Sequence, residues 1–177
     1  MSSDSMKAVP ANEQNKADSS GAGAPVADLM GLLEYRAETQ PDFPIYRYLR
    51  DGEDVAETLS FAEVALKAKT VAAALQGIAA AGERVMLLYL PGIEFVTSYF
   101  GCVYAKNIAI PLPPPRQSRM LQTLEKVLEI ARSAQPVAVL TTQAVKEKAE
   151  EHFASLPEFA AMRWLATDTL AAELAAD

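Results

Sequence analysis

Val85-Met86-Leu87-Leu88-Tyr89-Leu90 is a continuous apolar run, and Pro91-Gly92 closes it with a turn signal. A strand with one face in water alternates apolar and polar residues, whereas this run does not alternate. An unbroken apolar run of this length is typical of a strand that helices cover on both faces, as in parallel sheets. The stretch therefore predicts the first strand of a parallel sheet, followed by a turn.

Helical and strand-like segments alternate on the C-terminal side of this run. The expected helices cover residues 93–106, 118–133, 143–155 and 169–176, and the expected strands cover residues 108–112, 137–141 and 163–167. Asp168 is expected to cap the last of these helices. Strands and helices that alternate at this spacing form βαβ units with right-handed crossovers. We therefore expect an α/β fold with a parallel, doubly wound sheet.

The N-terminal side of the run predicts a helix and a β-hairpin. The helix covers residues 27–40, because its apolar side chains share one face and Pro41 stops it. The hairpin joins strands at 45–49 and 55–59 across a turn at 51–54. These elements precede the βαβ units in the chain.

A long helix should connect the hairpin to the first parallel strand. Ser60 and Glu63 form a capping-box pattern at its start, and Gly82 is a plausible stop at its end. Residues 1–26 contain almost no large apolar side chains and are expected to form a flexible leader. Residues 27–177 would then form one incomplete domain.

Composition and charge exclude several classes of protein. Half of the 177 residues are hydrophobic, which is enough for a sizeable core. The formal net charge of −7 argues against a nucleic-acid partner and against binding to anionic membranes. No secretory signal is visible, and no stretch reaches the roughly 20 apolar residues of a transmembrane segment. One cysteine and one histidine exclude an internal disulfide and argue against a zinc site, so we expect a cytoplasmic protein.

Motifs that bind phosphate or activate a nucleophile are absent from the sequence. It contains no G-x-x-x-x-G-K-[ST] loop, no G-x-G-x-x-G after a strand and no G-x-S-x-G elbow. His152 lies in a charged helix and is predicted to be a surface residue. Cys102 has apolar neighbours and is predicted to be a small buried side chain. Glu94, at a helix start, complements the helix dipole and disfavours an anionic ligand there.

The segment Pro111-Leu112-Pro113-Pro114-Pro115-Arg116 follows a parallel strand, where ligands gather in open α/β sheets. Proline fixes φ and removes a donor, so the segment should be stiff and extended. One interpretation is a rigid connection that directs the next helix. The other is a wall of a substrate channel, formed by Pro113 and Pro114 with Arg116 at its mouth.

Two stretches resemble the large domain of adenylate-forming enzymes. They are Gly82–Phe95, GERVMLLYLPGIEF, and Tyr99–Pro111, YFGCVYAKNIAIP. Within that superfamily, Phe100–Ala105 and the closing Pro114-Pro115-Arg116 are most similar to fatty acyl-AMP ligases, as is the turn 51–54 ahead of the capping box. The resemblance covers about residues 27–177.

The resemblance implies an enzyme that activates a long-chain fatty acid with ATP and Mg²⁺ to an acyl-adenylate and pyrophosphate. It also implies transfer of the acyl group to an acyl carrier protein, often for polyketide or non-ribosomal peptide assembly. The family's phosphate loop, adenine motif, ribose-binding aspartate and catalytic lysine would lie beyond Asp177, so no catalytic, cofactor-binding or metal residue is carried over. Pro113 replaces the tyrosine of the usual Tyr-Pro-Pro-Arg ending.

The resemblance leads us to expect the N-terminal portion of a fatty acyl-AMP ligase, inactive by itself. One alternative is a fragment of a fatty acyl-CoA synthetase, which differs in the acceptor of the acyl group. The other is a non-catalytic interaction module.

Overall fold

The structure is a computed structural model that describes residues 26–112, 120–153 and 156–176. The expected leader therefore lies outside the described residues, apart from Val26. The helices are α1 (Leu29–Thr39), α2 (Phe61–Gln76), α3 (Ile93–Tyr104), α4 (Met120–Ala134), α5 (Gln143–Phe153) and α6 (Pro157–Ala160). The strands are β1 (Pro44–Arg50), β2 (Asp54–Ser60), β3 (Arg84–Leu87), β4 (Ile108–Pro111), β5 (Ala138–Thr141) and β6 (Arg163–Ala166). Two short 3-10 turns follow, η2 (Thr167–Thr169) and η3 (Ala172–Ala176).

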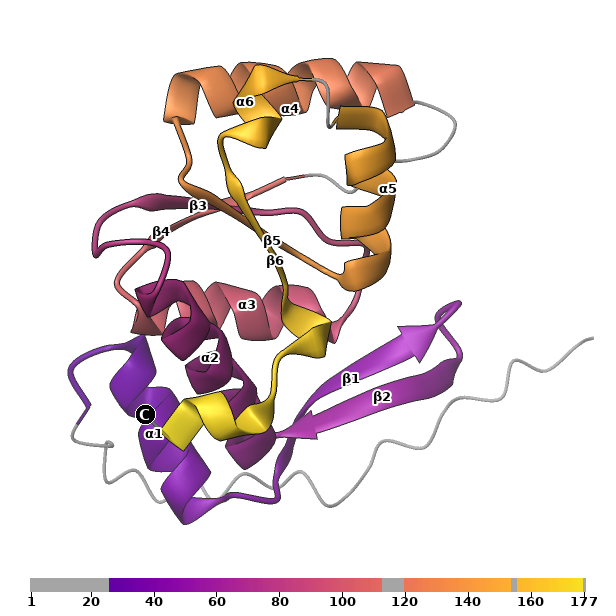
Figure 1. Cartoon of the computed structure of the whole chain (residues 1–177). Helices are drawn as coiled ribbons and strands as arrows, with labels where there is room; N and C mark the ends of the chain where they lie inside the picture. The colour runs from indigo at the N-terminus through magenta and orange to yellow at the C-terminus, as the bar shows by residue number, and fades with distance from the viewer. Residues whose placement is uncertain (1–25, 113–119, 154–155, 177) are drawn as a thin grey trace, which may run out of the picture.

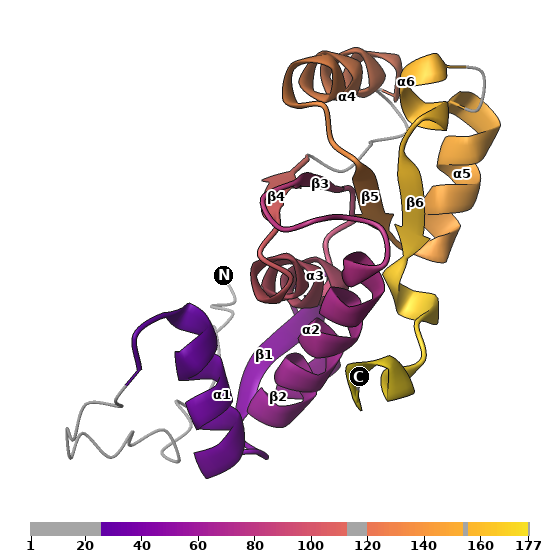
Figure 2. The same cartoon turned by 60° about the vertical axis from the view of Figure 1, so that its left-hand side comes forward.

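A four-stranded parallel sheet forms the centre of the fold, with the strand order β4-β3-β5-β6. Helices α2 and α3 lie on one face of this sheet, and α4 and α5 lie on the other (Figures 1 and 2). The chain runs from β3 to β4 on one side and then returns to β5 on the other, as in a doubly wound sheet. The expected α/β class and parallel sheet are confirmed.

The unbroken apolar run at β3 is explained by its two covered faces. Met86 and Leu88 pack into a cluster with side chains of α4 and α5. Val85, Leu87 and Tyr89 point to the opposite face, where they pack against α2 and α3. Successive side chains of a strand alternate between faces, so burial on both faces requires an apolar residue at every position.

The hairpin and α1 pack at the base of α2 and α3. Asp51 and Gly52 occupy the hairpin turn with φ of 53° and 82°, in the left-handed region, and the Glu53 N–H donates to the Arg50 carbonyl across the turn. Leu33 of α1 and Leu59 of β2 share a third buried cluster with residues of α2 and α3. The outer half of the hairpin projects away from this cluster (Figure 1).

Helix α2 begins as the capping box predicts. Ser60 Oγ accepts a hydrogen bond from the Glu63 N–H, and Glu63 Oε2 accepts one from the Ser60 N–H. The expected end at Gly82 is wrong, because the helix stops at Gln76 with Gly77 as its C-cap. Glycine is a poor helix former, and the N–H groups of Ile78 and Ala79 both turn back onto the Leu75 carbonyl.

Other expected boundaries also need correction. Strand β3 ends at Leu87 instead of Leu90, although the Leu88 N–H still donates to the Leu140 carbonyl. The expected final α-helix at 169–176 is wrong, since these residues lie in η2, a short link and η3. Helix α6 was not expected from the sequence. No helix of the described residues combines the length and apolarity needed to cross a membrane.

Candidate functional site

The strand order reverses at β3, because β4 lies on one side of it and β5 on the other. The carboxyl ends of these three strands lie together at this point. Open α/β sheets hold their ligands at this position, because the connections leave in opposite directions and open a crevice. The loop 88–92 follows β3, Leu112 follows β4, and Thr142 follows β5. The site is therefore built from these loops and from the helix starts that follow them.

A chain of hydroxyl groups fixes the loop after β3. Tyr89 is 3% exposed, and its hydroxyl lies 2.7 Å from Ser98 Oγ in α3 and 2.8 Å from Thr167 Oγ1 in η2. Thr167 also donates to the Thr141 carbonyl, and the Thr141 hydroxyl donates to the Leu88 carbonyl over 2.6 Å. Burial raises the pKa of Tyr89 above its ordinary value. The hydroxyl therefore stays protonated, and the network serves to tie β3, β5, α3 and η2 together.

An apolar groove of about 360 Å³ lies at the carboxyl ends of β3 and β4. The residues that line it are Tyr89, Leu90, Pro91, Gly92, Phe95, Pro111 and Leu112. Leu90 is 54% exposed although it is a large apolar side chain. The predicted channel wall, Pro113, Pro114 and Arg116, lies outside the described residues.

Helix α3 begins at the edge of the same groove. Gly92 is its N-cap and has no side chain to cap the first turn, which contains Glu94. A Cβ atom on Gly92 would lie 2.8 Å from Glu94 Oε2, so the carboxylate lies close to the start of the helix. A negative charge here complements the helix dipole and repels a phosphate group. The predicted role of Glu94 thus agrees with its position.

Three further residues, Cys102, His152 and Asp168, had predicted roles. Cys102 is fully buried, and burial raises the pKa of its thiol to about 12, which confirms the prediction of a small buried side chain. The side chain of His152 lies outside the described residues. The prediction that Asp168 caps a helix at 169–176 is wrong. Asp168 Oδ1 accepts a hydrogen bond from the Gln143 N–H and so caps α5. Sequence reasoning missed this contact because it joins residues 25 positions apart.

The loop after β3 lacks the features of a phosphate-binding loop. Among the described residues, no three histidine, cysteine or acidic side chains gather closely enough to hold a metal by themselves. The turn after β3 offers one glycine and is followed by Glu94, whereas a phosphate loop needs several free N–H donors and no negative charge. No step of nucleotide chemistry can therefore be assigned to the described side chains.

An open parallel sheet with helices on both faces and a groove at its carboxyl edge is the architecture of ligand-binding α/β proteins. The sequence model of the AMP-binding enzyme family matches residues 33–175. The chain belongs to that family.

Fatty acid ligases are among its relatives. The chain is 36% identical over 143 residues to the medium-chain-fatty-acid–[acyl-carrier-protein] ligase JamA of Moorena producens, a match that covers 80% of the chain and 24% of JamA. It is 34% identical over 122 residues to human Disco-interacting protein 2 homolog A, covering 66% of the chain and 8% of that protein.

A solved structure of a fatty acid AMP ligase is also similar to the chain. The crystal structure of the fatty acid AMP ligase from Legionella pneumophila superposes with a TM-score of 0.72 and 28% identity, over 83% of this chain and 24% of that one. The resemblance to fatty acyl-AMP ligases is thereby confirmed. The chain spans about a quarter of the length of JamA and of the Legionella ligase.

Proposed function

We propose that this chain is the N-terminal portion of a fatty acyl-AMP ligase. The whole enzyme would join a fatty acid to ATP, release pyrophosphate, and pass the acyl group to an acyl carrier protein. The likeness to the Legionella ligase carries the proposal, because it extends over 83% of the chain. The name of JamA, which describes a carrier-protein ligase, supports the choice of acceptor.

The chain would contribute a scaffold and part of the acyl site. The groove lined by Leu90, Phe95 and Leu112 is apolar, and each CH₂ group removed from water contributes about 0.8 kcal/mol. Pro113 and Pro114 would extend this groove as a channel wall, with Arg116 at its mouth. The hydroxyl network around Tyr89 would hold the loop 88–92 in place against the acyl chain.

ATP and Mg²⁺ would bind through residues outside the described ranges, and this chain alone would be inactive. When bound, Mg²⁺ offsets the phosphate charge that develops as pyrophosphate leaves. The described residues would act beside that centre by excluding water from the acyl chain.

An exchange assay tests the function. We would extend the chain to the length of the ligases it matches and measure ATP–pyrophosphate exchange with fatty acids of different lengths. Exchange that depends on a fatty acid is expected. If none of the fatty acids in the series supports exchange, the ligase proposal is overturned and the interaction module is favoured.

An acceptor assay tests the second half-reaction. The extended enzyme is charged with a radiolabelled fatty acid and offered either a phosphopantetheinylated carrier protein or coenzyme A. Label is expected on the carrier protein. Preferential formation of acyl-coenzyme A would instead identify a fragment of an acyl-CoA synthetase.

The groove has its own test. Replacing Leu90, an exposed side chain of the groove lining, by aspartate in the extended enzyme should raise KM for long fatty acids more than for short ones, because a longer chain would bury more of its length in the groove. Ile108→Asp, on β4 outside the groove lining and also at an exposed side chain, is the control. An equal effect on all chain lengths would exclude the groove as an acyl site.

A further inference from the structure

None of the described residues that line the apolar groove at the carboxyl ends of β3 and β4 is charged. The hydroxyl group in this lining belongs to Tyr89, and it is already shared between Ser98 and Thr167. An ionised carboxylate that entered the groove would lose its water without gaining a cation or a free hydroxyl donor from the lining side chains, which is costly. A fatty acid can therefore bury only its apolar part here.

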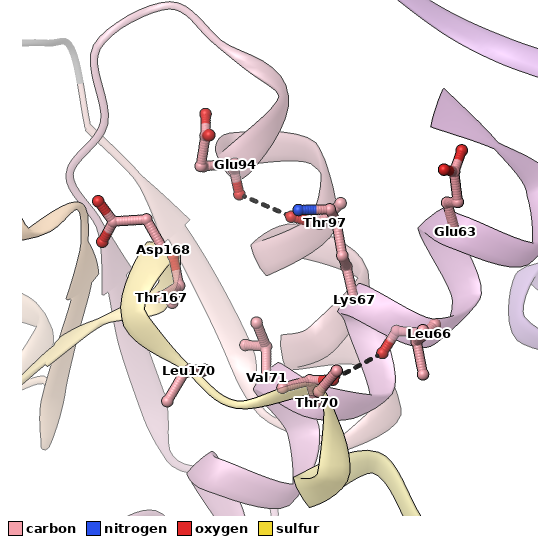
Figure 3. Close-up of a pocket in the computed structure, with 11 residues that line it drawn as sticks. Glu63, Leu66, Lys67, Thr70, Val71, Glu94, Thr97, Thr167, Asp168 and Leu170 are labelled. Atoms are coloured by element: carbon pink, nitrogen blue, oxygen red, sulfur yellow. Dashed lines mark hydrogen bonds between the residues drawn. The ribbon is translucent and has the colours of Figure 1, made fainter. Parts of the chain in front are cut away.

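Glu94 adds a negative charge beside one side of this groove. It lies in the first turn of α3, and a Cβ atom on Gly92, which lines the groove, would lie 2.8 Å from Glu94 Oε2. Glu94 also borders a second cavity, of about 410 Å³, but its carboxylate is turned out of that cavity and toward the loop before α3 (Figure 3). The carboxylate thus lies close to the groove without being part of its lining.

Two further observations bear on this charge. Burial is the main cause of the raised pKa of Tyr89, and the negative charge of Glu94 adds to it, so the field of Glu94 reaches a residue of the groove lining. Within the described part of the chain, Glu94 forms no ion pair that would neutralise it. The α3 side of the groove is therefore the side that a second negative charge should avoid.

We propose that Glu94 selects fatty acids by the charge at the end of the acyl chain. The terminal methyl group lies on the α3 side of the groove, next to Gly92 and Phe95, and Glu94 rejects a fatty acid that has a second carboxylate at that end. The carboxylate that reacts stays outside the groove, away from Glu94. This inference rests on the proposed function, because it takes the groove as part of the acyl site, and it adds a substrate class: monocarboxylic acids rather than dicarboxylic acids.

Two energetic costs have to be separated in a test of this selection. An apolar groove disfavours a charged group of either sign, because the group loses its water. Glu94, in contrast, repels a negative group and attracts a positive one. A dependence on the sign of the charge therefore distinguishes the effect of Glu94 from the cost of burial alone.

Three substrates of equal chain length separate these costs in the extended enzyme. Dodecanoate ends in a methyl group, dodecanedioate in a second carboxylate, and 12-aminododecanoate in an ammonium group. ATP–pyrophosphate exchange gives kcat/KM for each acid. Dodecanoate should be the best substrate, and kcat/KM for 12-aminododecanoate should exceed that for dodecanedioate by about tenfold. Equal values for the two acids with a charged end would overturn the proposal.

The variant Glu94→Gln tests whether this residue is the source of the discrimination. The amide has no charge, so the difference between 12-aminododecanoate and dodecanedioate should fall to about twofold or less. Both values come from the same protein, so a general loss of stability or activity leaves their ratio unchanged. Glu63→Gln is the matched control in the first turn of α2, because its amide oxygen can still accept the Ser60 hydrogen bond. The control should keep the tenfold difference, and an unchanged difference in Glu94→Gln would contradict the assignment.

A binding assay distinguishes failure of this inference from failure of the proposed function. The three acids compete with a fluorescent dodecanoate derivative for the extended enzyme. Exchange with dodecanoate but no dependence on the sign of the end charge would overturn the role of Glu94 and leave the ligase proposal in place. Sign-dependent competition without any exchange would support the role of Glu94 and overturn the ligase activity. Neither exchange nor competition would overturn both.

Discussion

Helices α2 and α3 approach each other closely at Gly101, and Gly101→Ala tests this packing. A Cβ atom on Gly101 would lie 2.6 Å from both Cβ and Cγ1 of Val71, and 3.1 Å from the Ala68 carbonyl oxygen. The Val71 Cβ is attached directly to the helix backbone, so a rotamer change cannot move it away. The substitution therefore forces the two helices apart.

The size of the effect follows from two opposing terms. Overpacking a well-packed core costs about 1–3 kcal/mol. Replacing glycine by alanine inside a helix returns up to about 1 kcal/mol. We expect the upper half of the overpacking range, because the clash involves a branched carbon and a backbone oxygen. The net loss of unfolding free energy should be about 1–2 kcal/mol.

Urea unfolding followed by the fluorescence of Trp164 measures this loss. Gly77→Ala is the matched control, because its nearest neighbour is the Ala74 carbonyl at 3.8 Å and its φ of −77° suits alanine. The control should gain about 0.5 kcal/mol. Adding Val71→Ala to Gly101→Ala should recover part of the loss, since Cγ1 is removed and Cβ stays. A Gly101→Ala protein as stable as the original chain would refute this account of the packing.

Three further predictions concern single groups. Tyr89→Phe removes the hydroxyl shared by Ser98 and Thr167 and should cost about 1–3 kcal/mol in urea unfolding; an unchanged midpoint would contradict the network. Burial raises the pKa of Glu34, but hydrogen bonds from Tyr104 and Lys69 outweigh it and hold that pKa below its ordinary value of 4.5. The carboxylate thus stabilises the fold above about pH 4.5 and loses this effect as pH falls through the lower folded-state pKa. The stability difference between the original chain and Glu34→Gln should therefore shrink on acidification, and a constant difference would exclude the contribution. The Cys102 thiol, with its pKa raised to about 12, should react with a disulfide reagent at pH 8 only after unfolding, so rapid native-state labelling would contradict its burial.

Local patterns predicted the sheet well because they report burial directly. The apolar run at 85–90 identified a strand covered on both faces, and the spacing of the later elements predicted the parallel order. The capping box at Ser60 and the turn at Asp51-Gly52 were readable because their partners lie within a few residues.

The remaining features depend on contacts that the sequence does not display. Gly77 and Gly82 are both credible helix stops, and the sequence does not show that the helix ends at the first. Asp168 precedes an apparent helix but caps α5 instead, through a contact made only after β5 and β6 pair. The hydroxyl network likewise joins Tyr89 to Thr167 across 78 positions, so no local motif marks it.

We expect these 177 residues to supply scaffold and part of an acyl site, and the nucleotide site of the proposed ligase to lie outside this chain. Titration calorimetry of the isolated chain with ATP and Mg²⁺ tests it most directly. No saturable heat of binding is expected. Saturable, magnesium-dependent binding of ATP to this chain would contradict it.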